Sequence, residues 1–148
     1  MALFTAFDIN ATGMTAERFR MDTISQNVAN ANTTRTEDGT PYRRKIVVFE
    51  EKNSPTHFHQ ILMKEHERFA GNGVKVTGVY EDTKTEGNMV YDPSHPDADE
   101  NGYVMYPNVN IITEFTNLID ASRAYQANGT AFSASKNMAT LGLSILNN

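Results

Sequence analysis

The feature that most constrains this chain is an apolar residue at every seventh position of its C-terminal part. One series is unbroken: Ile111, Leu118, Tyr125, Phe132, Ala139 and Leu146. A second series occupies the neighbouring positions: Ala124, Ala131, Met138 and Ile145. A repeat of this length predicts a helix that packs lengthwise along another helix. Pro107 precedes this helix, and Asn108 or Asn110 can cap its first turn.

The N-terminal segment carries a matching apolar stripe: Phe7, Met14, Met21 and Val28. Ala11, Ile24 and Ala31 fall three or four residues from these positions, so one face of the segment is apolar. Because no proline interrupts it, a helix is expected from Ala6 to Ala31. The Asn, Ala and Thr residues at positions 30–34 should stop this helix, since short polar side chains bond the backbone and tolerate left-handed dihedrals.

The middle of the chain differs in composition from both ends. Residues 35–107 hold 22 of the 31 charged residues and all five prolines. Their alternating and β-branched runs are typical of strands at four places: 42–50, 74–80, 88–91 and 103–106. The turn Gly71-Asn72-Gly73 precedes the second of these. Four such strands make one small sheet with little core of its own, so the sheet has to lean on the helices.

The sequence therefore predicts an α+β fold of three segments. Residues 1–34 form an N-terminal helix, residues 35–107 a small, mostly antiparallel β domain, and residues 108–148 a C-terminal helix. The two helices are expected to pair as an antiparallel coiled coil. A solitary helical hairpin that buries its own core would explain the stripes alone. The helix faces away from the stripes, however, carry Asn, Ser, Thr and Gln rather than Glu and Lys, which favours contact with further protein.

Composition excludes several classes of protein. The chain has 148 residues and no cysteine, which excludes disulfides, thiolate zinc sites, iron–sulfur clusters and a cysteine nucleophile. A net charge of −5 argues against nucleic acid as a partner. No apolar run approaches the roughly 18 residues of a transmembrane segment. The N-terminus lacks a basic stretch followed by an apolar block, so we expect a protein that is cytoplasmic or exported without a cleaved signal peptide.

The sequence offers no arrangement of residues suited to catalysis. His57, His59, His66 and His95 lack an H-E-x-x-H or comparable spacing, so no metal is expected at them. No nucleophile motif or glycine-rich phosphate loop is present, and nothing singles out a pair of carboxylates. We therefore expect no catalytic residue, no metal, no cofactor and no enzyme activity.

The acidic loop at residues 92–102 is the strongest candidate for a ligand-binding site. Asp97 to Gly102 matches the opening of a calcium-binding loop, but Asn108 stands where a bidentate Glu belongs. Three neighbouring prolines also oppose the flanking helices of such a site: Pro93, Pro96 and Pro107. A polar turn between two strands explains the same residues, with Gly102 at a positive φ.

Motifs at opposite ends of the chain resemble a single family. Residues 27–34, Asn-Val-Ala-Asn-Ala-Asn-Thr-Thr, resemble the N-terminal signature of bacterial flagellar rod, hook and hook-associated proteins. Residues 121–128, Ala-Ser-Arg-Ala-Tyr-Gln-Ala-Asn, resemble the C-terminal motif of that family. The stretches 91–104 and 107–110 look like those of its short proximal-rod members. They argue, with the short middle segment, against a distal-rod or hook relative.

The resemblance implies a structural subunit of the bacterial flagellar basal-body proximal rod. Such a subunit is exported uncleaved through the flagellar type III apparatus into the periplasmic space. It polymerises helically through its terminal helices, with itself and related rod subunits, to build the drive shaft for motility. The implied partners are therefore other rod subunits, the basal-body base and the export apparatus. The competing interpretation is an exported binding module that uses the acidic loop 92–102 for calcium or another ligand.

The residues expected at the assembly interface or in the family motifs lie on the two helices and at their ends: Phe7, Met14, Met21, Asn27, Asn30, Thr33, Asn108, Asn110, Leu118, Arg123, Tyr125, Asn128 and Phe132. Arg123 stands out because residues 108–148 hold only four charged residues. Its guanidinium either pairs with Asp120, three residues away, or bonds polar groups of an adjacent subunit.

Overall fold

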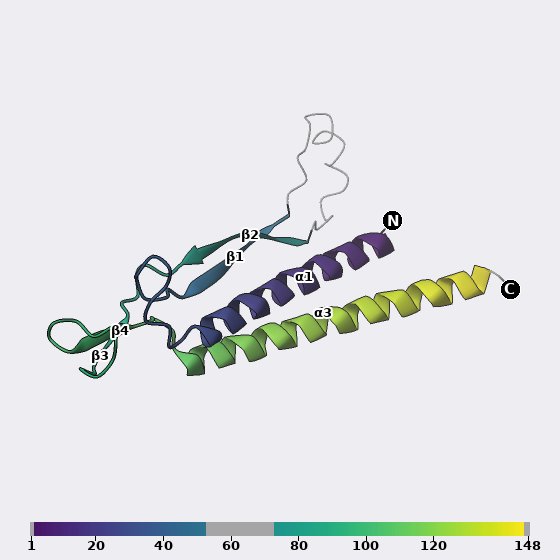
Figure 1. Cartoon of the computed structure of the whole chain (residues 1–148). Helices are drawn as coiled ribbons and strands as arrows, with labels where there is room; N and C mark the ends of the chain where they lie inside the picture. Colours follow the sequence, from purple (N-terminus) through teal and green to yellow (C-terminus); the bar gives the residue numbers. More distant parts are fainter. Residues whose placement is uncertain (1, 53–72, 147–148) are drawn as a thin grey trace, which may run out of the picture. The chain divides into compact units, whose positions relative to one another are not determined.

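The computed structural model describes residues 2–52 and 73–146. In chain order these form helix α1 (Ala2–Ala29), strands β1 (Lys45–Glu51), β2 (Val74–Glu81), β3 (Asn88–Tyr91) and β4 (Tyr103–Tyr106), and helix α3 (Ile111–Leu146) (Figure 1). The expected helices at the two ends and the four expected strands are confirmed. Within the described ranges, no helix is both long enough and apolar enough to cross a membrane.

Helix α1 ends, and helix α3 begins, next to polar residues that hydrogen-bond to the backbone of the helix terminus. Helix α1 starts earlier than expected and ends at Ala29, where the Asn30 amide still donates to the Gln26 carbonyl at 3.1 Å. No left-handed residue ends it, because every positive φ in the described residues belongs to a glycine. Helix α3 starts at Ile111, and the Asn110 side chain caps it by accepting the Thr113 amide at 3.1 Å. Asn110 rather than Asn108 is therefore the cap.

The strands form two separate two-stranded sheets, β1-β2 and β3-β4, not the single sheet expected from the sequence. Both are antiparallel. The Lys52 amide donates to Gly73 at one end of β1-β2, and the Asp82 amide donates to Arg44 at the other. This ladder stops at Asp82, because its carboxylate accepts the Lys84 and Thr85 amides and folds the next residues into a turn. Strand β3 then pairs with β4, with Met89 opposite Met105 and Tyr91 opposite Tyr103.

The chain divides into two compact units, each built from several segments. Unit 1 comprises Met1–Arg18, Phe49–Thr77 and Ser122–Asn148, and unit 2 comprises Phe19–Val48 and Gly78–Ala121. Both α1 and α3 run without a break from one unit into the other.

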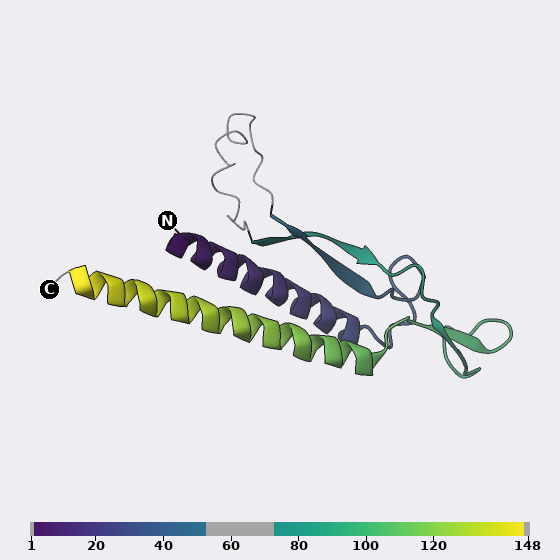
Figure 2. The ribbon, with the colours of Figure 1, turned by 180° about the vertical axis from the view of Figure 1, so that it is seen from behind.

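In unit 1 the first part of α1 packs against the second part of α3 (Figures 1 and 2). The Phe7 and Phe132 rings meet edge to face with centroids 5.0 Å apart. A Cβ built on Gly13 would lie 3.0 Å from the Asn128 side chain. Because 7 meets 132 and 13 meets 128, the two helical segments run antiparallel. The start of β2 is tied to α1 in the same unit, where the Val74 amide donates to the Thr12 hydroxyl at 3.2 Å.

The buried apolar core is small. Among the described residues, six apolar side chains are buried, and three of these are alanines: Ala16, Ile24, Ala31, Val104, Pro107 and Ala121. The heptad positions Phe7, Met14, Met21, Leu118, Tyr125 and Phe132 are half-buried. Others of the repeat are exposed: Ile111, Ala131, Met138 and Ile145. Full burial of the stripes in a coiled coil thus remains a prediction.

Candidate assembly surface and its polar anchor

The side chain of Asn27, at the end of α1 in unit 2, makes every hydrogen bond that it can. Asn27 is 1% exposed. Its Oδ1 accepts hydrogen bonds from the Lys45 amide and the Tyr42 hydroxyl, each at 2.9 Å. Its Nδ2 donates to the Lys45 carbonyl and to Glu114 Oε2, again at 2.9 Å. The carboxamide therefore joins the start of β1 to the first turns of α3 and leaves none of its bonding capacity unused.

The partner on α3 is a buried charge. Glu114 is 1% exposed, and its Oε1 accepts from Arg44 Nε at 2.8 Å. A carboxylate that far from water is tolerated only where charge and hydrogen bonds compensate it, and here both oxygens are occupied. Its place in the first turns of α3 also suits an acidic group, since helix N-termini carry partial positive charge. We call the group Asn27, Tyr42, Arg44, Lys45 and Glu114 the polar anchor.

Asn108 extends the polar anchor toward the turn after β2. Its Oδ1 accepts the Arg44 amide at 2.8 Å. Its Nδ2 donates to the carbonyls of Asp82 and Thr85 at 2.9 and 3.0 Å. The residue that the sequence offered as a possible helix cap is thus a cross-brace between β1, the turn at Asp82 and the start of α3. Asp82 is itself stabilised as an anion, because hydrogen bonds from Thr85 hold its pKa below the usual value.

The environment of Tyr42 favours its neutral form. Burial, and then the negative charges of Glu114 and Glu81, raise the pKa of the Tyr42 hydroxyl above its ordinary value of 10.0. A neutral tyrosine keeps the proton that it donates to Asn27. The hydroxyl is therefore a permanent donor in the polar anchor at neutral pH.

The remaining residues expected at the site are spread over both units. In unit 2, Asn30 Nδ2 donates to the Gln26 carbonyl, and the Thr33 hydroxyl donates to Asn30 Oδ1. In unit 1, Asn128 Nδ2 donates to the Ala124 carbonyl on its own helix, beside Gly13. The structure thus brings Asn27 and Asn108 into one intramolecular network, and pairs Phe7 with Phe132. It leaves Asn110 and Arg123 exposed.

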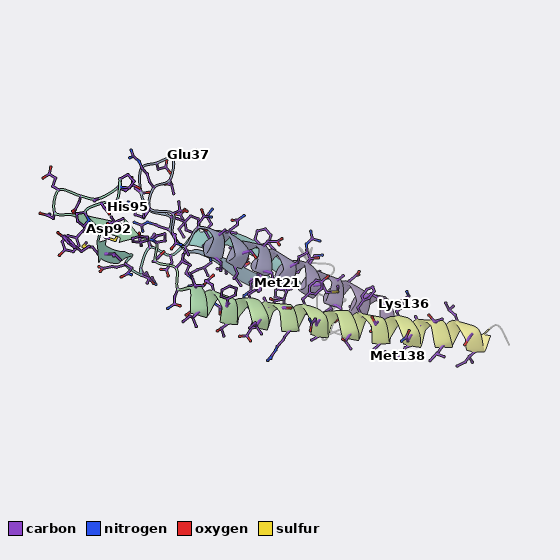
Figure 3. All side chains as sticks on the ribbon, turned by 60° about the horizontal axis from the view of Figure 1, so that its bottom comes forward. Met21, Glu37, Asp92, His95, Lys136 and Met138 are labelled. Carbon is purple, nitrogen blue, oxygen red and sulfur yellow. The ribbon has the colours of Figure 1, made fainter. Side chains whose placement is uncertain are left out.

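Large apolar side chains lie uncovered along α3. In unit 2 they are Ile111, Ile112, Phe115 and Ile119, of which Ile112 is 79% exposed. In unit 1 they are Met138, Leu141, Leu143 and Ile145, exposed by 60 to 75%. Figure 3 shows Met138 projecting from α3 away from α1. From Asn137 to Asn148 the chain has no charged residue, so the last turns of this helix present an apolar and uncharged surface. Uncovered apolar surface of this kind is typical of protein–protein contact sites.

Two carboxylates of the acidic loop between β3 and β4 shape the loop itself, whereas Asp97 pairs with Thr34 and Arg35. Asp92 Oδ1 accepts from the amide and hydroxyl of Ser94, and Asp99 Oδ1 accepts the amides of Asn101 and Tyr103. Gly102 has the expected positive φ of 79°. The loop joins two strands rather than two helices, as Figure 3 shows around Asp92 and His95. These features belong to the turn interpretation, and the binding-module alternative gains no support.

Three of the four histidines, His57, His59 and His66, lie outside the described residues. Within the residues that the structure describes, no three His, Asp or Glu side chains come together as a metal site would require. His95 lies in the β3–β4 loop, where its Nδ1 accepts the Asp97 amide at 3.1 Å. This histidine therefore helps to shape the same loop as the acidic residues around it.

Sequence reasoning missed Arg44, Tyr42 and Glu114 as site residues. Arg44 and Glu114 are 70 positions apart, so no local pattern joins them. One signal was available for Glu114. It is the only charged residue in the first turns of a helix that carries few charges, and such a charge needs a partner when the helix is packed.

Both ends of the chain match sequence models of rod proteins. Residues 7–35 match the family described as flagella basal body rod protein. Residues 100–145 match the C-terminal domain described for the flagellar basal body rod FlgEFG proteins. The first match contains Asn27, the donor of the hydrogen bond between α1 and α3, and the second contains Glu114, its acceptor. The class is that of flagellar basal-body rod proteins.

Relatives of nearly the same length narrow the class. The flagellar basal-body rod protein FlgC of Borreliella burgdorferi is 42% identical over 151 aligned positions, which cover 99% of both chains. FlgC of Bacillus subtilis is 41% identical, covering 98% of this chain and 99% of its own. FlgC of Salmonella typhimurium is 39% identical over 93% of both chains. The chain belongs to the FlgC family of flagellar basal-body rod proteins.

Proposed function

We propose that this chain is a structural subunit of the proximal rod of the bacterial flagellar basal body, and that it assembles through its terminal helices. Family membership supports the role in the rod. The observation that carries the assembly proposal is the contrast between a core of six buried apolar side chains among the described residues and the long uncovered apolar surface of α3. A chain with so little core gains much of its burial from neighbours.

The proposed assembly buries the heptad stripes and the exposed side chains of α3 against neighbouring subunits. Uncharged Asn, Ser and Thr side chains on the remaining helix faces support this, because they are less costly to bury than Lys or Glu. Contacts between different surface patches of identical or related subunits produce an open helical array when the rotation does not close. In this proposal residues 1–34 and 108–148 form the assembling coiled coil, and residues 35–107 form the domain between them.

The proposal also includes the binding partners of the chain and its location in the cell. Other rod subunits, further copies of this chain, the basal-body base and the flagellar export apparatus are its partners. The chain would be exported without cleavage and would act in the periplasmic part of the basal body as part of the drive shaft for motility. Such a role needs shape, contact and rigidity, and it needs no catalytic step.

The test places charge on the uncovered surface of α3. In a strain that lacks its own copy of the gene, the double variant Ile112→Glu with Ile119→Glu should abolish swimming and yield basal bodies without a complete rod. Burying two carboxylates where two isoleucines were buried weakens a contact by several kcal/mol, given about 2 kcal/mol for each lost apolar side chain alone. Circular dichroism of the purified variant should match that of the parent, because both positions are exposed in the single chain.

The matched control is Thr113→Glu with Thr140→Glu, which adds the same charge at exposed polar positions of α3 that lie about a quarter turn from the line of Ile112 and Ile119. It should reduce assembly less than the isoleucine variant does. Complete rods and normal swimming in the isoleucine variant would contradict assembly through this surface.

A further inference from the structure

The apolar stripes of α1 and α3 alone fit more than one alignment of the two helices. Phe7 contacts Phe132, and a slide of one heptad toward the end of α3 would bring it to Ala139, a member of the same series. Helix α3 has 36 residues and α1 has 28, so α1 can slide by seven residues without leaving α3. Repeating apolar patterns leave such slipped alignments close in energy.

Unlike the apolar stripes, the polar anchor has no equivalent seven residues further along the helices. Asn27 Nδ2 donates to Glu114 Oε2 at 2.9 Å, and both side chains are 1% exposed. One heptad further along α3 lies Ala121, whose methyl group accepts no hydrogen bond. In the slid alignment a buried amide proton faces that methyl group, and the Glu114 carboxylate loses its partner on α1. Each loss is expensive because neither group reaches water.

We propose that the polar anchor sets the register of α1 on α3, with Asn27 and Glu114 as positioning residues. The apolar stripes supply attraction, and the buried amide–carboxylate pair selects one alignment out of those that the stripes permit. A single buried polar contact is known to select register in paired helices while adding little stability. The inference does not rest on rod assembly, and it is tested on the isolated full chain, so its failure would leave the proposed function standing.

Register can be measured by disulfide formation, because the chain has no cysteine of its own. A Cβ at Gly13 lies 3.0 Å from Asn128, so the pair Gly13→Cys with Asn128→Cys reports the observed alignment. The pair Gly13→Cys with Ser135→Cys reports the alignment slid by one heptad. In the otherwise unchanged chain the first pair should form a disulfide in about tenfold excess over the second.

The decisive variant replaces the polar anchor by apolar groups of similar size: Asn27→Leu, Arg44→Met and Glu114→Leu together. We expect its helix content to stay near that of the parent and its two disulfides to form within about threefold of each other. Its Tm should fall only in part, because Asn27→Leu leaves the Tyr42 hydroxyl and the Lys45 backbone groups without their partner. A retained tenfold preference for the first pair would overturn the proposal. So would a variant that fails to fold, because the polar anchor would then supply stability rather than register.

A second variant keeps the shape of the site. Asn27→Asp removes the donor and sets a carboxylate against Glu114 and the Lys45 carbonyl, while the Lys45 amide and the Tyr42 hydroxyl still donate to it. Arg44 Nε remains paired with Glu114 Oε1. The preference for the first disulfide should again fall to about threefold or less. The control Asn30→Leu changes a polar residue that bonds within the same helix end, and it should keep the tenfold preference. If Asn27→Asp lowers the Tm and leaves the preference unchanged, Asn27 is a stabilising contact only, and the proposal is wrong.

Discussion

At the scale of single residues, Tyr42 links the polar anchor to pH. Its folded-state pKa lies above the unfolded value of 10.0, because burial and the charges of Glu114 and Glu81 oppose ionisation. A pKa raised by folding means that the unfolded chain releases this proton first as pH rises. The contribution of Tyr42 to stability is therefore complete below pH 10 and is lost above it, as the pH passes through the folded-state pKa.

We predict that Tyr42→Phe flattens the alkaline loss of stability. The free energy of unfolding, measured by urea denaturation at increasing pH, should fall less steeply above pH 10 in the variant than in the parent. At neutral pH the variant should be less stable by about 1 kcal/mol, since the hydrogen bond to Asn27 is lost. Tyr125→Phe removes a hydroxyl outside the polar anchor and serves as the control. Equal alkaline slopes in Tyr42→Phe and the parent would contradict the assignment.

At the scale of elements, the start of β2 depends on a glycine that touches α1. Gly73 has a φ of 79°, and a Cβ built on it would collide with the Thr12 side chain. That hydroxyl donates to the Ile9 carbonyl at 2.7 Å and accepts the Val74 amide, so it cannot move without breaking bonds. Gly39 has a similar φ of 75°, but a Cβ added there would meet no atom within 4 Å.

We therefore predict that Gly73→Ala destabilises the chain more than Gly39→Ala does. Gly39→Ala meets only the backbone penalty of a positive φ, about 1 kcal/mol, whereas Gly73→Ala adds the collision with Thr12 and should cost about 2–3 kcal/mol. Thermal denaturation of the two purified variants measures the difference. Equal Tm values would show that Thr12 gives way at no cost.

The elements follow from local sequence, and their pairing does not. Strands β3 and β4 begin and end where the sequence predicted, because Tyr, Val and Met runs stand between glycine, proline and acidic turn residues. The split into two sheets was not predicted, because it depends on how the Asp82 carboxylate and the Asn108 amide fold the turn after β2. Asn27 was singled out by a motif, but its contact with Glu114 joins residues 87 positions apart, which no periodicity encodes.

At the scale of the whole molecule, the imbalance between core and surface points to assembly. Three of the six buried apolar residues among those described are alanines. By contrast, four large side chains are exposed together on one face of β3-β4: Met89, Tyr91, Tyr103 and Met105. A two-stranded sheet is marginal by itself, so this face gains stability when a neighbour covers it. The helices and this sheet face are the parts of the chain in which substitutions should affect assembly more than folding.

Arg123 gives the sharpest test of that separation. It is exposed on α3, and the described part of the chain provides its guanidinium with no hydrogen bond or ion pair. The proposed pairing with Asp120 is thus not made in the single chain, which leaves contact with polar groups of an adjacent subunit as the hypothesis. Arg123→Lys keeps the charge but loses the planar guanidinium group, whose several N–H donors can bond two acceptors at once.

We predict that Arg123→Lys lowers the yield of complete rods severalfold and leaves the Tm of the purified chain within about 1 °C, as expected for an exposed substitution. Lys136→Ala, which removes another exposed cation of the same helix, should assemble better than Arg123→Ala. If Arg123→Ala builds complete rods at the parental yield, its guanidinium is only a solvated charge and the contact does not exist.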